Sequence, residues 1–307
     1  MRIKIFVLLC LTAIMQIYGV TPLKASHYYY KQLSLKDGVT SAVRCILTDK
    51  QGFVWIGTKA GISRYDGHEL KKYVHSPNNP PNNLIHQIAE DEMSNIWILT
   101  DKGIARYQRQ SDDFFLPTDE KGNPIIAYST CLTKDGVLFG SKDKVYFYSY
   151  RDSSLRLLQK LNKGNNFNIS LLSLWNEHTV LCCSRWQGLA LLDLKTGKHR
   201  LPPFDCGKEI MNMLIDSQNR IWIAPYNEGI KCFTHNGELV KAYTTHNSDL
   251  SNNVVLSLAE REGKIWIGTD GGGINILEPE TGRLSLLEHI PGGDSYSLPA
   301  TSIFCLY

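Results

Sequence analysis

The sequence predicts an all-β protein, a β-propeller whose blades are four-stranded antiparallel sheets. A short apolar phrase, typified by VWIGTKAGISRYDG, occurs six times, and its copies begin at Val54, Ile96, Val137, Val180, Ile221 and Ile265. The second residues of these copies are Trp55, Trp97, Leu138, Leu181, Trp222 and Trp266, at steps of 42, 41, 43, 41 and 44 residues. A period of about 40–45 residues, made of short apolar runs and turn residues, is typical of a propeller blade.

The first copy shows how one blade is encoded. Two apolar runs, 43–47 and 53–58, are separated by a polar turn that contains a glycine. A third run, 62–65, is followed by Asp66-Gly67, a dipeptide that favours a tight hairpin. Residues 69–74 alternate between polar and apolar types, as a half-exposed outer strand does. Consecutive hairpins therefore predict a four-stranded sheet.

The residue types of the repeat suit stacked blades. The second strand is apolar on both sides, as expected of a sheet packed between two neighbours, and its Trp supplies a large buried area. A glycine follows the next turn in five copies, where a positive φ or a close backbone approach is expected: Gly61, Gly103, Gly188, Gly229 and Gly273. Lys144 replaces this glycine in the third copy, whose loop is shorter and is expected to fold differently.

The period divides residues 26–307 into six blades and the start of a seventh. The expected blades are approximately residues 34–75, 76–117, 118–160, 161–201, 202–244 and 245–290, and residues 291–307 repeat the beginning of a blade. Ile303-Phe304-Cys305-Leu306 parallels Val43-Arg44-Cys45-Ile46. The next motif Trp would fall near position 310, so we expect the seventh blade to be truncated after its first strand and the chain to be part of a longer protein.

Residues 1–25 have the pattern of a secretory signal peptide. Arg2 and Lys4 precede the apolar run 5–15, and small or polar residues follow up to Ala25. Cleavage after Ala25 would remove three of the 33 basic residues and none of the 30 acidic ones, which leaves 30 of each. The exported chain would be nearly neutral, which gives no support for nucleic-acid binding.

The sequence contains no recognisable catalytic or metal motif. Seven cysteines lie outside the leader, an odd number with no CxxC pair, so they predict neither a disulfide framework nor a zinc site and are expected to be small core residues. No GxSxG, HExxH or P-loop pattern is present, and Gly271-Gly272-Gly273 is expected to be a hairpin turn. Asp49, Asp91 and Asp216 precede turns, which they are expected to cap. We therefore expect no catalytic residue, no cofactor and no metal.

The turns after the WIGT strand are the best candidates for a ligand site, because equivalent turns of a propeller meet on one face around the central channel. Arg185 and Trp186 of blade four would lie beside Tyr226 and Asn227 of blade five, and Lys102 of blade two would lie on the same face. Aromatic rings stack on sugar faces, and Arg and Asn donate hydrogen bonds to hydroxyl or carboxylate groups. The alternative is that Trp186 only covers the edge of its blade and Arg185 is simply solvated.

The segment from Leu33 to Tyr73, LSLKDGVTSAVRCILTDKQGFVWIGTKAGISRYDGHELKKY, closely resembles the first blade of the two-component regulator propeller repeat. The likeness extends from Tyr30 to Tyr307. The resemblance implies the periplasmic sensor part of a Bacteroidetes hybrid histidine kinase, which detects a ligand, commonly a polysaccharide breakdown product, and signals to transcription by phosphorelay. It also implies a homodimer held in the membrane by a helix downstream of these residues. A secreted propeller acting as a carbohydrate-active enzyme or as a protein-binding scaffold remains the alternative.

Overall fold

The computed structural model describes residues 33, 37–39, 41–73, 84–161, 167–207, 209–287, 298 and 300–307. The predicted signal peptide lies outside these residues. Twenty-four strands form six four-stranded antiparallel sheets, each built from strands consecutive in the sequence, and no helix occurs in the described part of the chain. The fold class predicted from the repeat is confirmed.

The strands of the first three blades have the following bounds. Blade one contains β1 Val43–Thr48, β2 Val54–Thr58, β3 Gly61–Tyr65 and β4 Leu70–Tyr73; blade two contains β5 Ile85–Glu90, β6 Ile96–Thr100, β7 Gly103–Gln108 and β8 Asp113–Phe115; blade three contains β9 Ser129–Thr133, β10 Gly136–Ser141, β11 Lys144–Ser149 and β12 Leu155–Lys160.

The other three blades follow the same order. Blade four contains β13 Ile169–Asn176, β14 Thr179–Ser184, β15 Gly188–Asp193 and β16 His199–Arg200; blade five contains β17 Ile210–Ile215, β18 Ile221–Pro225, β19 Ile230–Phe233 and β20 Leu239–Tyr243; blade six contains β21 Val255–Arg261, β22 Lys264–Thr269, β23 Ile274–Glu278 and β24 Arg283–Leu287.

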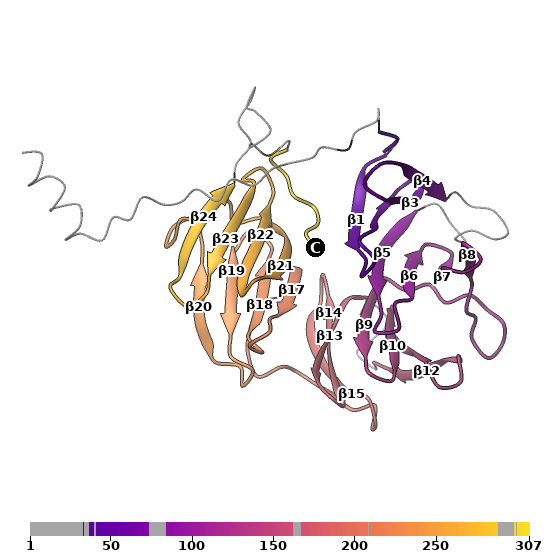
Figure 1. Ribbon diagram of the computed structural model, residues 1–307. Helices are drawn as coiled ribbons and strands as arrows, with labels where there is room; N and C mark the ends of the chain where they lie inside the picture. Colours follow the sequence, from indigo (N-terminus) through magenta and orange to yellow (C-terminus); the bar gives the residue numbers. More distant parts are fainter. Residues whose placement is uncertain are drawn as a thin grey trace, which may run out of the picture.

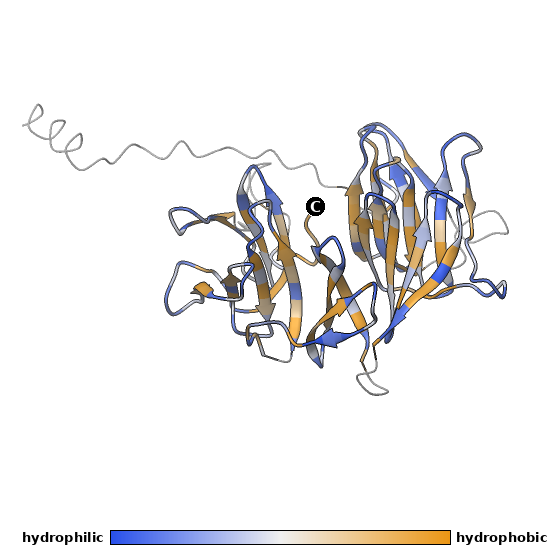
Figure 2. Cartoon of the chain, turned by 90° about the horizontal axis from the view of Figure 1, so that it is seen from below, coloured by the Kyte–Doolittle hydropathy of each residue, from blue (hydrophilic) through white to orange (hydrophobic). Residues whose placement is uncertain are grey.

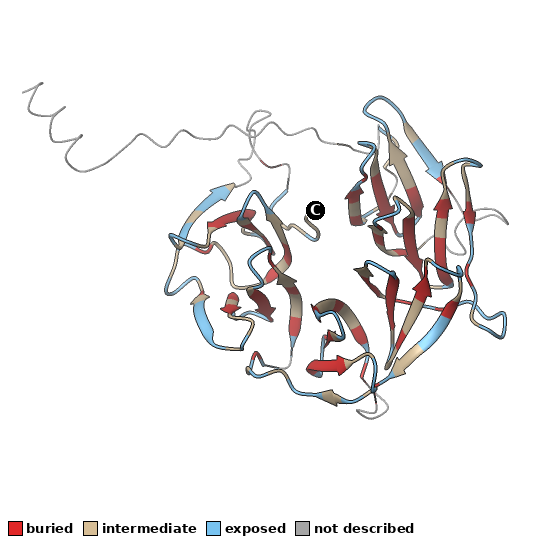
Figure 3. Ribbon diagram, turned by 60° about the horizontal axis from the view of Figure 1, so that its bottom comes forward, coloured by how far each residue is buried: buried red, intermediate tan, exposed pale blue. Residues whose placement is uncertain are grey.

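The blades are arranged in sequence order around a common centre (Figure 1). The first strand of each blade is innermost and contacts the first strand of the next, from β1 and β5 through to β17 and β21. Hydrophobic residues concentrate in the strands and hydrophilic residues in the connecting loops (Figure 2). Every residue of β6 and β18 is buried, whereas the outer strand β20 begins with three exposed residues (Figure 3). The expectation that the second strand is covered on both sides is confirmed.

A recurring Asp–Trp hydrogen bond ties the first turn of a blade to its second strand. The indole Nε1 of Trp55 donates to Asp49 Oδ2 at 2.9 Å, and Trp97 and Trp222 donate in the same way to Asp91 and Asp216 at 2.8 Å. The other carboxylate oxygen accepts backbone amides of the turn, such as Phe53 N at 2.9 Å on Asp49. The predicted capping role of these aspartates is confirmed, and the bond to Trp explains why both residues recur six positions apart.

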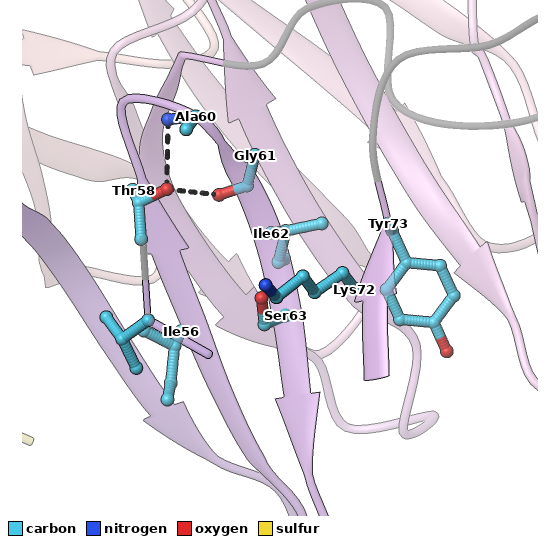
Figure 4. A pocket seen from close by; sticks show the side chains of 9 residues that line it. Ile56, Thr58, Ala60, Gly61, Ile62, Ser63, Lys72 and Tyr73 are labelled. Carbon is cyan, nitrogen blue, oxygen red and sulfur yellow. Dashed lines mark hydrogen bonds between the residues drawn. The ribbon is translucent and has the colours of Figure 1, made fainter. Parts of the chain in front are cut away.

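A threonine closes the turn between the second and third strands. Figure 4 shows Thr58, whose hydroxyl accepts a hydrogen bond from Ala60 N and donates one to Gly61 O, both at 2.9 Å. The hollow beside this turn has a volume of about 40 Å³, so it admits little more than a water molecule.

The glycines that the repeat places after these turns, Gly61, Gly103, Gly188, Gly229 and Gly273, all have positive φ. At Gly229 a Cβ atom would also lie 2.1 Å from the carbonyl oxygen of Tyr243, so the position excludes any side chain. In the third copy the turn contains only residues 142–143, and Lys142 takes a positive φ of 49°. This turn is shorter than those of blades four to six but has the same two-residue length as those of blades one and two, so the predicted shortening holds only in part. The predicted difference in folding is confirmed, because the equivalent residues Lys59 and Asp101 do not have a positive φ.

Trp266 differs from the other repeat tryptophans. Trp55, Trp97 and Trp222 are fully buried between blades, but Trp266 is only partly buried and packs beside Ile303 and Leu306. Among the described residues, the segment 298–307, rather than a complete sheet, lies on that side of blade six. Trp266 is therefore less buried than the equivalent tryptophans.

The described part of the expected seventh-blade start lies against blade six without forming a sheet of its own. Gly273 N donates to Thr301 O at 2.8 Å, and Gly229 N donates to Asn253 O at 3.0 Å in the equivalent joint between blades five and six. Ile303 N donates to Thr269 O at 3.0 Å. Residues 301–303 thus take the place that the start of an inner strand takes at the other joints.

Candidate functional site

Each inner strand begins with a β-bulge. The pairing of the first and second strands shifts after Val43, Ile85, Ile169, Ile210 and Val255, so that the next residue is left out of the register. In blade three Tyr128 takes this place, because its amide donates to Gly140 O while Gly140 is also the partner of Ser129. We call the six extra residues the bulge ring: Arg44, His86, Tyr128, Ser170, Met211 and Leu256.

The bulge ring lies on the face that carries the turns predicted to bind ligand. The start of each first strand pairs with the end of the second strand, just before that turn; Val43, for example, pairs with Thr58. Bulges redirect side chains and are frequent beside functional sites. None of the six bulge residues is fully buried. The ring and the turns therefore form one continuous surface around the channel.

Two neighbouring members of the ring are in contact. The His86 Nε2 atom forms a short hydrogen bond with Asp101, which lies in the turn after β6. The His86 ring also contacts Tyr128 edge-on, with ring centroids 5.2 Å apart. Asp101 fixes the orientation of the imidazole, which in turn positions the tyrosine ring of the next blade. Lys102 is exposed in the same turn as Asp101, and its amide donates to Thr100 Oγ1 at 3.2 Å.

The ring and the blade-four turn enclose a small pocket. Its volume is about 210 Å³, and its wall includes Tyr128, Asn168, Ser170, Arg185 and Trp186. Trp186 is 64% exposed, and the Arg185 guanidinium lies 5.2 Å from the centre of its ring. An exposed aromatic ring, a guanidinium, an amide and two hydroxyls therefore line one recess. The recess brings Arg185 and Trp186 together with Tyr128 of blade three and with the start of blade four. Arg185 Nη2 also donates to Met211 Sδ of blade five at 3.2 Å.

Tyr226 and Asn227 lie on the same face but make no direct contact with Arg185 or Trp186 among the described residues. The two turns are joined through the backbone: Ile210 N donates to Arg185 O at 3.0 Å, and Tyr226 N donates to Glu209 O at 2.7 Å. Tyr226 is 52% exposed, and Asn227 occupies a turn position with a φ of 58°. Both side chains remain accessible to a ligand that extends beyond the blade-four recess.

Sequence reasoning missed His86, Tyr128, Asn168 and Ser170. A signal was nevertheless present, because four members of the bulge ring, Arg44, His86, Tyr128 and Ser170, are spaced by exactly one 42-residue step. These positions follow the first apolar residue of each inner strand. The residue type at these positions differs from blade to blade, whereas the neighbouring repeat positions stay apolar. Such variation is expected of a surface that recognises a ligand.

The strongly displaced pKa values of cysteines belong to the blade interiors and not to this face. Burial raises the pKa of Cys131 and of Cys183 to about 12, so both thiols stay protonated and unreactive. Among the described residues, no three His, Cys, Asp or Glu side chains gather in a way that could hold a metal ion. Within the same residues no helix has the length and apolar character needed to cross a membrane.

The fold is a β-propeller in which the Asp–Trp turn recurs in blades one, two and five. Residues 37–60 and 249–271 match the two-component regulator propeller family, so the chain contains two-component regulator propeller repeats. No curated protein matches the sequence.

Solved structures share the fold. The extracellular domain of a protein described as the hybrid two-component system BT3049 from B. thetaiotaomicron has a TM-score of 0.71 and 20% identity, over 90% of this chain and 39% of that one. The extracellular domain of BT4673 from the same organism has a TM-score of 0.71 and 21% identity, over 91% and 37%. This chain therefore spans less than two-fifths of the length of these domains.

An enzyme also shares the architecture. Virginiamycin B lyase from Staphylococcus aureus has a TM-score of 0.59 and 13% identity, over 80% of this chain and 83% of that one. At such identities the likeness concerns the fold alone, so the function has to be argued from the residues of the site.

Proposed function

We propose that this chain is the ligand-sensing propeller of a periplasmic hybrid two-component sensor histidine kinase, and that its ligand is an oligosaccharide released from a polysaccharide. The observation that carries the proposal is the recess formed by Tyr128, Asn168, Ser170, Arg185 and Trp186. Aromatic rings provide stacking platforms for sugar rings, and the guanidinium, amide and hydroxyl groups match hydroxyl or carboxylate substituents. The regulator propeller repeats and the extracellular sensor domains of the same fold support the sensor role.

In this proposal the signal is a population shift in a homodimer. A ligand changes the balance between two arrangements of the protomers only if it binds one of them more tightly. Signal passes through a membrane helix downstream of these residues to kinase and receiver domains and then to transcription. The propeller itself performs no chemistry. Its export depends on the predicted signal peptide at residues 1–25.

The test is a binding measurement on the full extracellular region. Trp186→Ala, Tyr128→Ala and Tyr226→Ala are titrated by calorimetry with a panel of acidic and neutral oligosaccharides. Because stacking on an aromatic ring contributes about 1 kcal/mol, Trp186→Ala and Tyr128→Ala should each weaken binding by about fivefold or more, and Tyr226→Ala should weaken binding only of longer oligosaccharides. Phe115→Ala removes another partly exposed aromatic side chain, from β8, and should bind as the wild type does. Unchanged affinity in both the Trp186 and Tyr128 variants would contradict the proposed site.

A second candidate is a secreted carbohydrate-active enzyme, and the His86–Asp101 pair favours it. A histidine oriented by a carboxylate is a common general base. Incubation of the protein with polysaccharides and analysis of the products separates the two candidates. Product formation that disappears in His86→Ala supports the enzyme, whereas binding without turnover supports the sensor.

A further inference from the structure

The interface between blades three and four contains a cavity at a joint whose counterparts in the first two interfaces hold a pair of aromatic rings. At the interface of blades two and three, Trp97 packs edge-on against Tyr148 of the next blade, with ring centroids 4.7 Å apart. The equivalent residues one blade later are Leu138 and Leu192, because Leu192 pairs with Val180 as Tyr148 pairs with Val137. Two large rings are thus replaced by two leucines at one joint.

The space left at this joint is large enough for a small molecule. The cavity has a volume of about 560 Å³, and ligand pockets usually measure about 300–1,000 Å³. Leu138, Phe147, Leu158, Leu174 and Leu194 provide an apolar floor. The rim is formed by the turns between the first and second strands, so the cavity opens on the face opposite the bulge ring. The site is therefore separate from the proposed oligosaccharide site and does not depend on it.

Arg156 supplies the polar group that would orient a ligand. It lies on the outer strand β12, and its guanidinium is 5.8 Å from the centre of the Phe147 ring. The rim of the cavity also carries Lys134, Asp135 and Glu177, whose charges cancel when that of Arg156 is included. The Arg156 guanidinium forms an ion pair with Asp152 at 3.9 Å, which is longer than a hydrogen bond. The guanidinium donors are therefore accessible to an acidic group placed over the apolar floor.

We propose that the cavity between blades three and four binds a small aromatic molecule with one acidic group, its rings on the leucines and Phe147 and its acidic group on Arg156. Two fluorescent probes of matched shape test this: anilinonaphthalene sulfonate, which carries the acid, and N-phenylnaphthylamine, which lacks it. Both are titrated into the folded wild-type chain and its variants, and circular dichroism and the unfolding temperature establish that each variant is folded.

Leu138→Trp restores the motif residue and fills the floor, so both probes should bind about tenfold more weakly or not at all. Arg156→Gln removes the charge at a half-exposed position, so only the sulfonate should weaken, by about fivefold to tenfold. Trp186→Ala, on the opposite face, should leave both affinities unchanged.

Three outcomes overturn the proposal. The first is wild-type binding of both probes by folded Leu138→Trp. The second is an Arg156→Gln variant in which the sulfonate is unaffected or both probes weaken equally, and it decides the matter even if Leu138→Trp does not fold. The third is loss of binding in Trp186→Ala, which would place the probes on the channel face.

Discussion

The interface between blades one and two and the interface between blades three and four involve equivalent positions of the repeat but contain different side chains. At the first, Trp55 packs against Tyr107 with ring centroids 4.8 Å apart, and Arg64 donates to the Tyr107 hydroxyl at 2.6 Å. At the second, Leu138 and Leu192 take the places of the two rings, and a cavity of about 560 Å³ remains. The strand pairing persists although the rings are gone. The backbone of the blade is therefore specified by its hairpins, and the side chains that fill a joint can vary.

Placing a leucine at the Trp position between blades one and two, as occurs between blades three and four, should have the largest effect on stability. Trp55→Leu removes the indole that packs on Tyr107 and that satisfies Asp49, without altering the hairpins. We expect a loss of about 3 kcal/mol in the free energy of unfolding, because the substitution leaves a cavity and a buried carboxylate oxygen with one partner fewer. Urea unfolding followed by circular dichroism measures it. Leu181→Ala, at the repeat position of blade four, is a control for the cost of an ordinary core truncation. A Trp55→Leu variant as stable as the wild type would show that the aromatic filling is dispensable.

Removing the cap beneath the tryptophan should have a smaller effect. Asp49→Ala leaves the Trp55 indole, two turn amides and one Arg109 hydrogen bond without their acceptor, so we expect a loss of about 2 kcal/mol. Asp49→Asn keeps one oxygen acceptor and should cost less. If both variants were as stable as the wild type, the recurring Asp would not contribute to the stability of the blade. The same unfolding experiment compares the three proteins.

The smallest effect should be a pH dependence of the free energy of unfolding that arises from Asp112, at the interface of blades one and two. Burial disfavours the charged form of Asp112, but hydrogen bonds from Lys71, Tyr107 and Tyr73 outweigh it and lower the pKa of this carboxyl to about 2 from its usual 3.8. Because the folded-state pKa is the lower one, the ionised carboxylate contributes stability above about pH 4, and this contribution is lost as the pH falls toward 2. Asp112→Asn should flatten the stability profile in that window only. Identical acid profiles for variant and wild type would exclude this contribution.

Much of the fold could be predicted from the sequence because the repeat fixes it locally. Six copies of an apolar strand, five of them with a following glycine, specify the hairpins, and Asp49 at its turn indicated the cap. The Asp–Trp bond was not foreseen, since nothing in a linear pattern states which side chain a carboxylate reaches. The lower burial of Trp266 could not be predicted from its strand, because burial depends on the neighbouring sheet and not on the strand that carries the residue.

The candidate site could be predicted only in part. Arg185 and Trp186 were identified from their turn, and the structure places them in one recess. Tyr128 and Ser170 escaped notice because a bulge, which changes pairing by one residue, leaves no mark in the hydrophobic pattern. Arg185 lines the recess and also contacts Met211 of blade five, and sequence spacing does not encode the side-chain directions that decide such contacts.

The bulge ring has a consequence for how this surface can change. Each of its six residues comes from a different blade, lies outside the regular strand pairing and is separated from the next by a complete structural repeat. A substitution at one of them alters one sector of the channel mouth without changing the strand pairing of the blade, and only neighbours in contact, such as His86 and Tyr128, are expected to be coupled. Substitutions at single ring positions can thus change which ligand is preferred while the propeller scaffold stays the same.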